Sequence, residues 1–240
     1  LYTIESRAIP SICDGMKPVQ RFYLYSSLVN TAKDFKKVSA VSGIVSDYGY
    51  NHGEASAAGA GQLMAATWNN NVCLIEGRGS FGTRQVPQAG AARYVYTRLH
   101  PNFNKYVKDI DLVLQHEDPE HIPPKFYMPV IPLVLANGTK GIATGFATNI
   151  LPRSTKDLIN ACKEYITTGK IKKNLPIIFP DFKGKTVAML DNQYDCYGIV
   201  KRVNSNTVAI SEIPYGTDRE TYVKILDKLE SENKISGFED

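Results

Sequence analysis

A glycine-rich, basic connection between two strand-like segments is the feature that most limits how this chain of 240 residues can fold. Residues 72–76 and 93–99 are rich in apolar, β-branched and aromatic side chains, which favour strands. Residues 77–88 between them are rich in glycine and polar side chains, which favour a loop. We therefore expect a loop with room for the backbone of a ligand, placed before the neighbouring pair Arg93 and Tyr94.

Tyr94 is the side chain in this region with the most distinctive chemistry. A phenol has a pKa of about 10, so it acts as a nucleophile near neutral pH only if cations favour the phenolate or a base takes its proton. Arg93 can supply part of that field, and the same cation stabilises charge on a phosphoryl group under attack. A second interpretation stays open, because Tyr94 and Tyr96 alternate with Val95 as in an ordinary strand.

The charge of the chain is concentrated around this loop. The formal net charge is +4, and the stretch from Glu76 to Lys108 holds Glu76 against six basic residues: Arg78, Arg84, Arg93, Arg98, Lys105 and Lys108. One basic segment in an otherwise balanced chain is typical of a surface that binds a polyanion, with nucleic acid as the obvious candidate. A solvated charged face explains the run equally well.

Several classes of protein do not fit the sequence. It contains no apolar run of the roughly 18 residues that a membrane span needs, and no signal peptide, so we expect an intracellular globular protein. The four cysteines are widely separated, which indicates neither a zinc site nor a disulfide framework. The histidines of residues 116–121 have the wrong spacing for a zinc-protease helix, and Pro119 would break that helix. We expect no metal site in this chain.

Residues 77–82 also satisfy the Gly-x-Gly-x-x-Gly pattern of dinucleotide-binding loops, which raises a nucleotide-dependent oxidoreductase as a further hypothesis. That loop must open directly into a helix, whereas the residues that follow include Pro87 and no helical pattern. The chain begins with Leu rather than Met, so we expect a piece of a longer protein.

The pattern along the chain changes near residue 150. Before it we expect short helices or turns over 7–25 and a short strand over 109–114. Residues 26–38 and 53–68 lack strand alternation, and we expect the second of these segments to form a helix that begins near His52 or Gly53. After it we expect helices over 155–168 and 218–232, and strands over 187–190, 198–203 and 207–213. The predicted domains are residues 1–148 and 149–240.

Several blocks of sequence, in the same order and over nearly the whole chain, resemble the DNA cleavage and religation region of type IIA DNA topoisomerases. The blocks are residues 6–10 (SRAIP), 14–21 (DGMKPVQR), 50–54 (YNHGE), 81–84 (FGTR), 91–94 (AARY) and 137–145 (NGTKGIATG). The FGTR block and the Gln20–Arg21 pair are more similar to eukaryotic and T-even phage enzymes than to bacterial gyrase, whereas residues 145–150 (GFATNI) are gyrase-like.

The resemblance implies an α+β fold: a winged-helix (helix-turn-helix) DNA-gate domain over residues 1–148, followed by a truncated α/β tower domain over 149–240. It implies that Tyr94 attacks a DNA phosphodiester and becomes linked to the 5′ phosphate, in an enzyme that passes one duplex through a transient break in another at the expense of ATP. The alternative is a non-catalytic winged-helix DNA-binding domain, in which Arg93 and Tyr94 only contact the backbone.

Site residues follow from the resemblance position by position. Besides the nucleophile Tyr94, it implies that Arg93 supports the transition state, Arg21 binds the scissile phosphate, and His52 contributes a hydrogen bond or proton transfer. Five further residues are expected to contact DNA: Arg7, Lys17, Ser56, Arg84 and the wedge Ile142, which bends the duplex by entering between base pairs.

The sequence departs from the family at two positions and lacks two of its parts. Asn51 stands where many relatives carry a second histidine, and Phe22 stands at a position that is basic in many of them. We find no acidic Toprim block, which holds the magnesium that stabilises the phosphate and the leaving 3′ oxygen, and no ATPase motif.

The resemblance therefore implies several partners: double-stranded DNA, a Toprim/ATPase subunit or missing segments carrying those functions, Mg²⁺ held mainly by the Toprim domain, ATP, and a second copy of this chain. No membrane partner is expected. The isolated chain is expected to bind DNA weakly without cleaving it. The expected location is the cytoplasm of a phage-infected host cell, or the nucleus if the source is a eukaryotic-type single chain.

Overall fold

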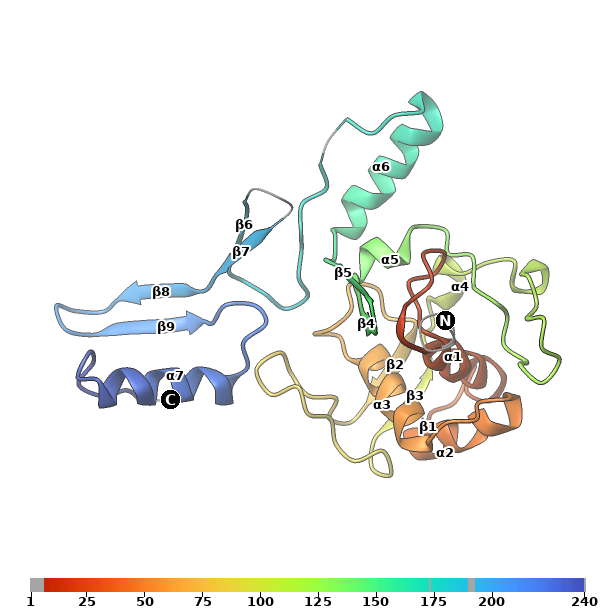
Figure 1. The fold of residues 1–240 in the computed structure, drawn as a ribbon, viewed down its shortest axis with the longest axis horizontal. Helices are drawn as coiled ribbons and strands as arrows, with labels where there is room; N and C mark the ends of the chain where they lie inside the picture. The colour runs from red at the N-terminus through yellow and green to blue at the C-terminus, as the bar shows by residue number, and fades with distance from the viewer. Residues whose placement is uncertain (1–6, 173, 190–192, 240) are drawn as a thin grey trace. The chain divides into compact units, whose positions relative to one another are not determined.

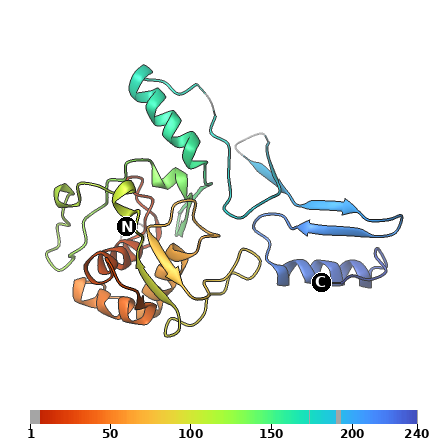
Figure 2. The same ribbon diagram turned by 180° about the vertical axis from the view of Figure 1, so that it is seen from behind.

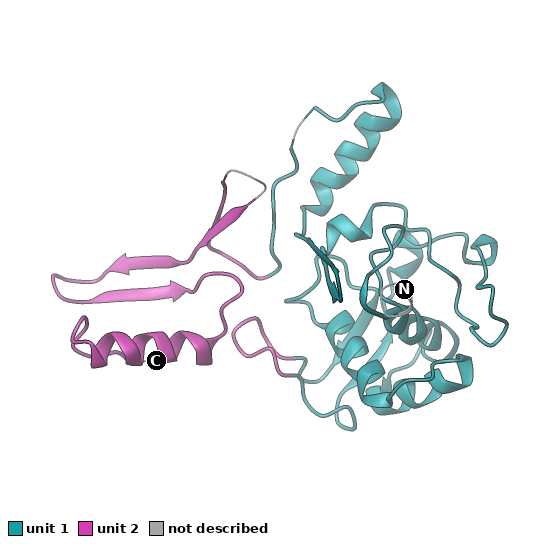
Figure 3. Ribbon diagram, in the orientation of Figure 1, with its two compact units in different colours: residues 1–81, 89–180 teal, residues 82–88, 181–240 magenta. Residues whose placement is uncertain are grey.

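The chain divides into two compact units, which Figure 3 distinguishes by colour. The computed structural model describes residues 7–172, 174–189 and 193–239. Unit 1 comprises residues 1–81 and 89–180, and unit 2 comprises residues 82–88 and 181–240. The short loop 82–88 thus belongs to unit 2, although both of its neighbours in sequence belong to unit 1. The division at residue 148 expected from the sequence stays a prediction.

Unit 1 begins with a group of helices, drawn in red and orange in Figure 1: α1 (Pro18–Asn30), α2 (Val38–Gly43), the 3₁₀ helix η2 (Ile44–Tyr48) and α3 (Glu54–Ala65). Pro18 occupies the first turn of α1, where its missing N–H costs nothing and its fixed φ favours the start of a helix. The small residues of α3 allow close packing, because a side chain at Gly61 would overlap the ring of Tyr23 on α1.

Unit 1 also contains a three-stranded antiparallel sheet, formed by β1 (Lys36–Lys37), which lies between α1 and α2 in the chain, and by β2 (Ile75–Arg78) and β3 (Tyr96–Leu99), which follow α3. Strand β3 lies in the middle and pairs with both neighbours, so that Thr97 stands opposite Lys36 on one side and Gly77 on the other. Figure 2 shows this region from behind. Thr97 and Leu99 are buried on one face of β3, whereas Tyr96 is exposed on the other.

The remainder of unit 1 consists of short elements and one longer helix: α4 (Phe103–Tyr106), the 3₁₀ helix η3 (Ile110–Leu112), α5 (Leu133–Ala136), the hairpin β4 (Thr139–Ala143) and β5 (Phe146–Ile150), and α6 (Thr155–Thr168). Helix α6 has the predicted bounds, and the Ser154 hydroxyl caps it by accepting the N–H of Asp157 at 3.3 Å. The strand expected over 109–114 is wrong, because η3 occupies that segment and Asp109 before it has φ +52°.

The core of unit 1 joins the helices to the sheet. Its fully buried members include residues of α1, α2, β2, α4 and α6 and of the segments after α4: Tyr23, Leu24, Val38, Val41, Ile75, Phe103, Leu158, Val107 and Tyr127. Each such side chain contributes about 1.5–3 kcal/mol relative to an exposed one. Met64 and Ala65 of α3 and Leu99 of β3 belong to the same core, which therefore holds α1 and α3 against the strand that follows Tyr94.

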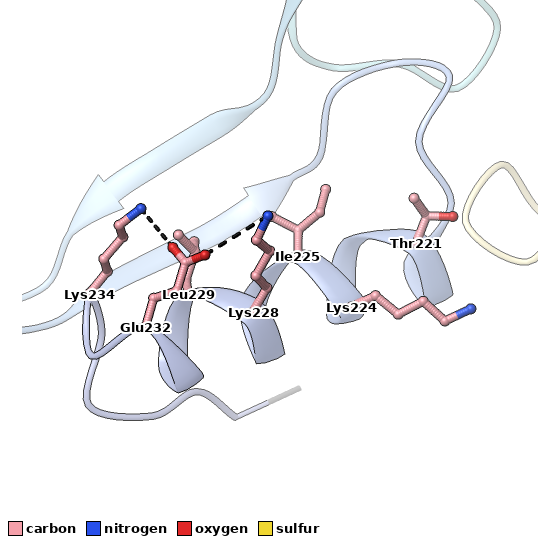
Figure 4. A pocket seen from close by; sticks show the side chains of 7 residues that line it. All are labelled: Thr221, Lys224, Ile225, Lys228, Leu229, Glu232 and Lys234. Carbon is pink, nitrogen blue, oxygen red and sulfur yellow. Dashed lines mark ion pairs between the residues drawn. The ribbon is translucent and has the colours of Figure 1, made fainter.

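Unit 2 contains two hairpins and a helix: β6 (Lys185–Ala188) with β7 (Tyr194–Tyr197), β8 (Ile199–Arg202) with β9 (Val208–Glu212), and α7 (Arg219–Ser231). The Asp218 carboxylate caps α7 by accepting the N–H of Thr221 at 2.7 Å. A hollow of about 460 Å³ lies along α7, as Figure 4 shows, lined by Thr221, Lys224, Ile225, Lys228, Leu229, Glu232 and Lys234. None of the residues predicted from the sequence to act on DNA lines it.

These elements confirm the α+β class and rule out one alternative. Between Gly79 and Val95 the chain forms no helix, so the glycine-rich loop lacks the helix that a dinucleotide-binding loop must open into. The oxidoreductase hypothesis is therefore wrong on structural grounds. Three α-helices together with a small antiparallel sheet, whose first strand lies between α1 and α2, are consistent with a winged helix, which remains an interpretation of this arrangement.

Candidate active site

Tyr94 lies in a turn immediately before β3, not inside the strand that the sequence pattern predicts. Its N–H donates to the carbonyl of Ala91 at 2.8 Å, which closes the turn. The Tyr94 side chain is 68% exposed. The guanidinium carbon of Arg93 lies 4.9 Å from the centre of the Tyr94 ring, within the range of a cation–π contact. The phenol is therefore accessible to a large substrate and has a cation beside it.

The turn that carries Tyr94 is held from two sides. Two N–H groups at the start of α2 bond to it: that of Val38 donates to Val95 O at 3.0 Å and that of Ser39 to Ala92 O at 3.1 Å. The buried Val95 side chain is covered by the glycine-rich loop, because a methyl group at Gly79 would stand 3.2 Å from it. Burial of Val95 directs its neighbour Tyr94 outward.

His52 lies just before α3, whose N-cap is Gly53, as the sequence predicts. Its ring meets that of Tyr50 edge-on at 5.4 Å, and Tyr50 in turn lies 5.3 Å from Phe22. The Phe22 ring continues the series, with its centroid 4.5 Å from that of His121. Phe22, the departure from the family noted above, thus packs in a small aromatic cluster that supports the segment carrying His52.

Arg21 is buried in an ion pair with Asp14. Its Nε donates to Asp14 Oδ2 at 2.7 Å, and its Nη2 donates to Asp14 Oδ1 at 3.2 Å and to Met16 O at 2.7 Å. The residue is 6% exposed. These bonds use Nε and Nη2, so a phosphate would have to be bound through Nη1. The phosphate-binding role of Arg21 stays a prediction.

Arg84 is also buried, within unit 2. Its Nη2 pairs with the Glu212 carboxylate on β9, and its guanidinium carbon lies 5.6 Å from the centre of the Phe182 ring. The two paired side chains are 8% and 6% exposed. The Arg84 guanidinium therefore links the loop 82–88 to the rest of unit 2. Because the side chain is buried and paired, its geometry does not favour the DNA contact expected from the sequence. That contact stays a prediction.

The other expected DNA contacts lie at or near the surface of unit 1. Arg7 and Ser56 are exposed, and Lys17 is half-buried next to the N-terminus of α1. Ile142 on β4 is 70% exposed, which argues against the core position that an isoleucine usually takes. An exposed apolar side chain on a hairpin is suited to insertion between bases.

The structure brings Arg93 to Tyr94 but does not join Tyr94 to Arg21 or His52. Within the described part of the chain, no hydrogen bond or ion pair connects Tyr94 to either of them. Among the same residues, no group of three or more His, Cys, Asp or Glu side chains is placed to hold a metal ion. All four cysteines are described and are free thiols.

Sequence reasoning missed the partners that position these cations. The sequence predicts no role for Asp14 or Glu212. In the structure Asp14 pairs with Arg21, and Glu212 pairs with Arg84. Asp14 could have been found, because it lies inside the same quoted block as Arg21. Glu212 had no local signal, since 128 positions separate it from Arg84.

Residues 7–240 match the protein family of the DNA gyrase/topoisomerase IV A-subunits. The chain is 48% identical over 240 residues to the DNA topoisomerase medium subunit of Enterobacteria phage T4, covering 98% of this chain and 54% of the phage protein. It is 33% identical over 238 residues to DNA topoisomerase 2 of Plasmodium falciparum, covering 95% of this chain and 17% of that protein. The chain thus spans about half, or less, of the length of these relatives.

The fold is similar to a solved structure of the same kind. A crystal structure of the DNA-binding, cleavage and re-ligation domain of Plasmodium falciparum topoisomerase II superposes with a TM-score of 0.90 at 32% sequence identity. The match covers 97% of this chain and 33% of the other. Both units described above therefore have counterparts in that domain.

Proposed function

Because this chain belongs to the DNA gyrase/topoisomerase IV A-subunit family, we propose that it supplies the DNA-cleaving tyrosine of a type IIA topoisomerase. The observation that carries the proposal is the Tyr94 side chain, 68% exposed in a turn with the Arg93 guanidinium 4.9 Å from its ring. The buried phenols of Tyr23 and Tyr127 provide a contrast, because burial raises the pKa of each above the ordinary value of 10.0.

The proposed reaction is a transesterification at a DNA phosphodiester. The Tyr94 phenolic oxygen attacks phosphorus and forms a new P–O bond, while the bond from phosphorus to the 3′ oxygen breaks. The phenolic proton passes to a base, for which we propose His52, and the leaving 3′ oxygen takes up a proton. The product is a 5′-phosphotyrosyl link. One phosphate ester replaces another, so the reverse attack by the 3′ hydroxyl reseals the strand without added energy.

Arginine supports this chemistry through charge. As the phosphate passes through its transition state, negative charge builds on its equatorial oxygens, and a guanidinium donates two parallel hydrogen bonds to such oxygens. We propose that Arg93 does this beside Tyr94 and that Arg21 binds the scissile phosphate through Nη1. We further propose that Arg7, Lys17 and Ser56 hold the neighbouring backbone.

The assembly needed for duplex passage is part of the proposal. It includes double-stranded DNA, a second copy of this chain and a further protein or further segments with Toprim and ATPase functions. We propose that the Toprim domain holds Mg²⁺ and that the ATPase uses ATP. In the described residues no helix is long and apolar enough to cross a membrane. The proposed location is the cytoplasm of a phage-infected host, or the nucleus for a eukaryotic-type chain.

Covalent trapping tests the nucleophile. The full-length protein and its Toprim/ATPase partner are mixed with end-labelled duplex DNA and Mg²⁺ and then denatured, so that protein-linked DNA can be counted. We expect Tyr94→Phe to abolish the linked product, because it removes only the attacking oxygen. DNA binding by that variant, measured by fluorescence anisotropy, should stay close to that of the parent.

Tyr96→Phe is the matched control, because Tyr96 lies two residues further on and is also exposed. It should form as much linked DNA as the parent. If Tyr94→Phe also retains the linked product, the nucleophile assignment is lost and the non-catalytic DNA-binding alternative stands.

A further inference from the structure

The β4–β5 hairpin presents one face to solvent. In its antiparallel register Lys140 stands opposite Asn149, and Ile142 stands opposite Ala147. Side chains alternate along a strand, so these four residues share one face. All four are exposed. We call Lys140, Ile142, Ala147 and Asn149 the outer hairpin face.

The opposite face of the hairpin rests on the segment that precedes α1. Gly141 is buried there, and a methyl group at this position would lie 2.5 Å from the carbonyl oxygen of Ala8 and 2.8 Å from Pro10 Cδ. The Thr139 hydroxyl donates to Gly15 O at 3.2 Å. The backbones are thus in direct contact, which fixes the outer hairpin face in its outward orientation.

The residues that contact the hairpin lie close in sequence to two cations: Arg7 precedes Ala8, and Lys17 is two residues after Gly15. The segment under Gly141 begins next to Arg7 and leads into Lys17, both already proposed as backbone contacts. Lys140 adds a third positive charge on the same part of unit 1. Basic side chains next to these contact points suit the phosphates of a duplex better than an apolar protein partner.

The residue spacing along β4 determines how far Lys140 lies from Ile142, the expected wedge. Two residues along a strand span about 6.8 Å, so the Lys140 Cα lies about that far from the Ile142 Cα. The minor groove of B-form DNA is about 6 Å wide and has phosphates along both edges. If Ile142 enters a base step from that groove, Lys140 comes to the edge of the groove, with Asn149 about 5 Å from it across the hairpin.

We propose that Lys140 and Asn149 are DNA contacts that act with Ile142 on the outer hairpin face. The Lys140 ammonium binds a phosphate beside the kinked step, and the Asn149 amide donates to a sugar or base-edge acceptor in the minor groove. Both contacts form fully only when the duplex bends around the hairpin, so they favour the bent state. This inference rests on the proposed function, to which we add the wedge role of Ile142 that the family resemblance implies.

Salt-dependent DNA binding and bending test the inference in the full-length protein assembled with its partner. Binding of a labelled duplex is measured by anisotropy over a series of salt concentrations, and bending by energy transfer between dyes at the two ends. For Lys140→Gln we expect the slope of log K against log salt to fall by about 1, because one phosphate contact is lost. Energy transfer at saturation should also fall, and Asn149→Ala should lower it while leaving the salt slope unchanged.

Lys163→Gln is the charge control, because Lys163 is exposed on α6 and its replacement removes the same charge away from the hairpin. It should leave both readouts at the parent values. A Lys140→Gln slope equal to that of the parent, or a Lys163→Gln slope that falls equally, overturns the inference.

Ile142→Ala separates this inference from the proposed function. If Ile142→Ala abolishes bending while Lys140→Gln changes neither the salt slope nor the energy transfer, the proposed function stands and the inference about Lys140 is refuted. If the parent assembly neither binds nor bends duplex DNA, the proposed function itself is refuted, and the inference that rests on it is refuted with it. Lys140 and Asn149 are exposed, so all variants should keep the melting temperature of the parent, and that measurement excludes misfolding as the cause.

Discussion

The Tyr23 phenol and the Thr97 hydroxyl share a buried hydrogen bond of 2.6 Å that joins α1 to β3 three residues after Tyr94. Both residues are 0% exposed. Burial raises the pKa of Tyr23, and the bond to Thr97 partly opposes that increase. The phenol therefore stays protonated at neutral pH and ties the turn of Tyr94 to the helix that carries Arg21.

Removing one partner of this bond should cost more than removing both. Tyr23→Phe leaves the Thr97 hydroxyl buried without its partner, and we expect a loss of about 1–3 kcal/mol in the free energy of unfolding. The double variant Tyr23→Phe, Thr97→Val should lose less than the sum of the single variants. Urea denaturation of the three variants measures the coupling; additive losses would contradict an energetic link between α1 and β3.

Two glycines of the same helix should respond in opposite ways to alanine. Gly61→Ala places a methyl group against the Tyr23 ring, so overpacking of about 1–3 kcal/mol should outweigh the gain in helix propensity of about 1 kcal/mol. At Gly59 nothing lies within 4 Å of the added methyl group, so Gly59→Ala should raise stability by about 0.5–1 kcal/mol. Equal melting temperatures for the two variants would show that α1 and α3 pack less closely than described.

The ion pair between Arg84 and Glu212 decides between a structural and a DNA-binding role for Arg84. Glu212 also accepts the N–H of Lys183 at 3.1 Å. Arg84→Met leaves the buried carboxylate without its cation, and we expect a loss of about 3–5 kcal/mol in the free energy of unfolding. Adding Glu212→Gln to Arg84→Met removes the unpaired charge and should recover part of that loss.

A direct role for Arg84 on DNA predicts the reverse pattern. Arg84→Met would then leave urea denaturation unchanged and lower the salt slope of DNA binding by about 1. Both quantities can be measured on the same preparation, so the two roles are distinguished within one experiment.

Local signals explain which elements the sequence predicts correctly. Helix α6 has the predicted bounds because a capping serine, an amphipathic pattern and Gly169 at its end all lie within the segment itself. Helix α1 crosses the end of the segment 7–25, for which the sequence predicts short helices or turns; it begins at Pro18, because proline is favoured in the first turn of a helix. In both cases the deciding signal is local.

The contacts of the candidate site also differ in whether the local sequence predicts them. Tyr94 and Arg93 are neighbours in sequence, so the chain itself brings them together. The burial of Arg84 depends on Glu212, far along the chain, and no pattern near residue 84 indicates that partner. The outward direction of Ile142 and Lys140 depends on Gly141 resting against Ala8, a contact that only the folded chain creates.

His121 should make the stability of the protein depend on pH. Its ring stacks on that of His116 at 3.9 Å and lies 4.5 Å from that of Phe22. Partial burial is the largest of the effects that lower the pKa of His121 to about 4; the positive charges of His116 and Arg21 add to it, and the carboxylate of Asp118 opposes it. The folded protein therefore binds fewer protons than the unfolded chain between about pH 6.5 and pH 4.

The direction of the effect follows from that difference in bound protons. Because the unfolded state binds more protons in this window, stability is highest above pH 6.5 and is lost as the pH falls toward 4. His121→Phe keeps an aromatic ring between Phe22 and His116 but cannot be protonated, so its urea midpoint should fall less between about pH 7 and pH 5 than that of the parent. His116→Gln removes one of the repelling charges and should reduce the pH dependence to a smaller extent. An undiminished pH dependence in His121→Phe would mean that other groups, such as the Glu117 carboxylate whose pKa the bond to Lys125 lowers, account for the acid sensitivity.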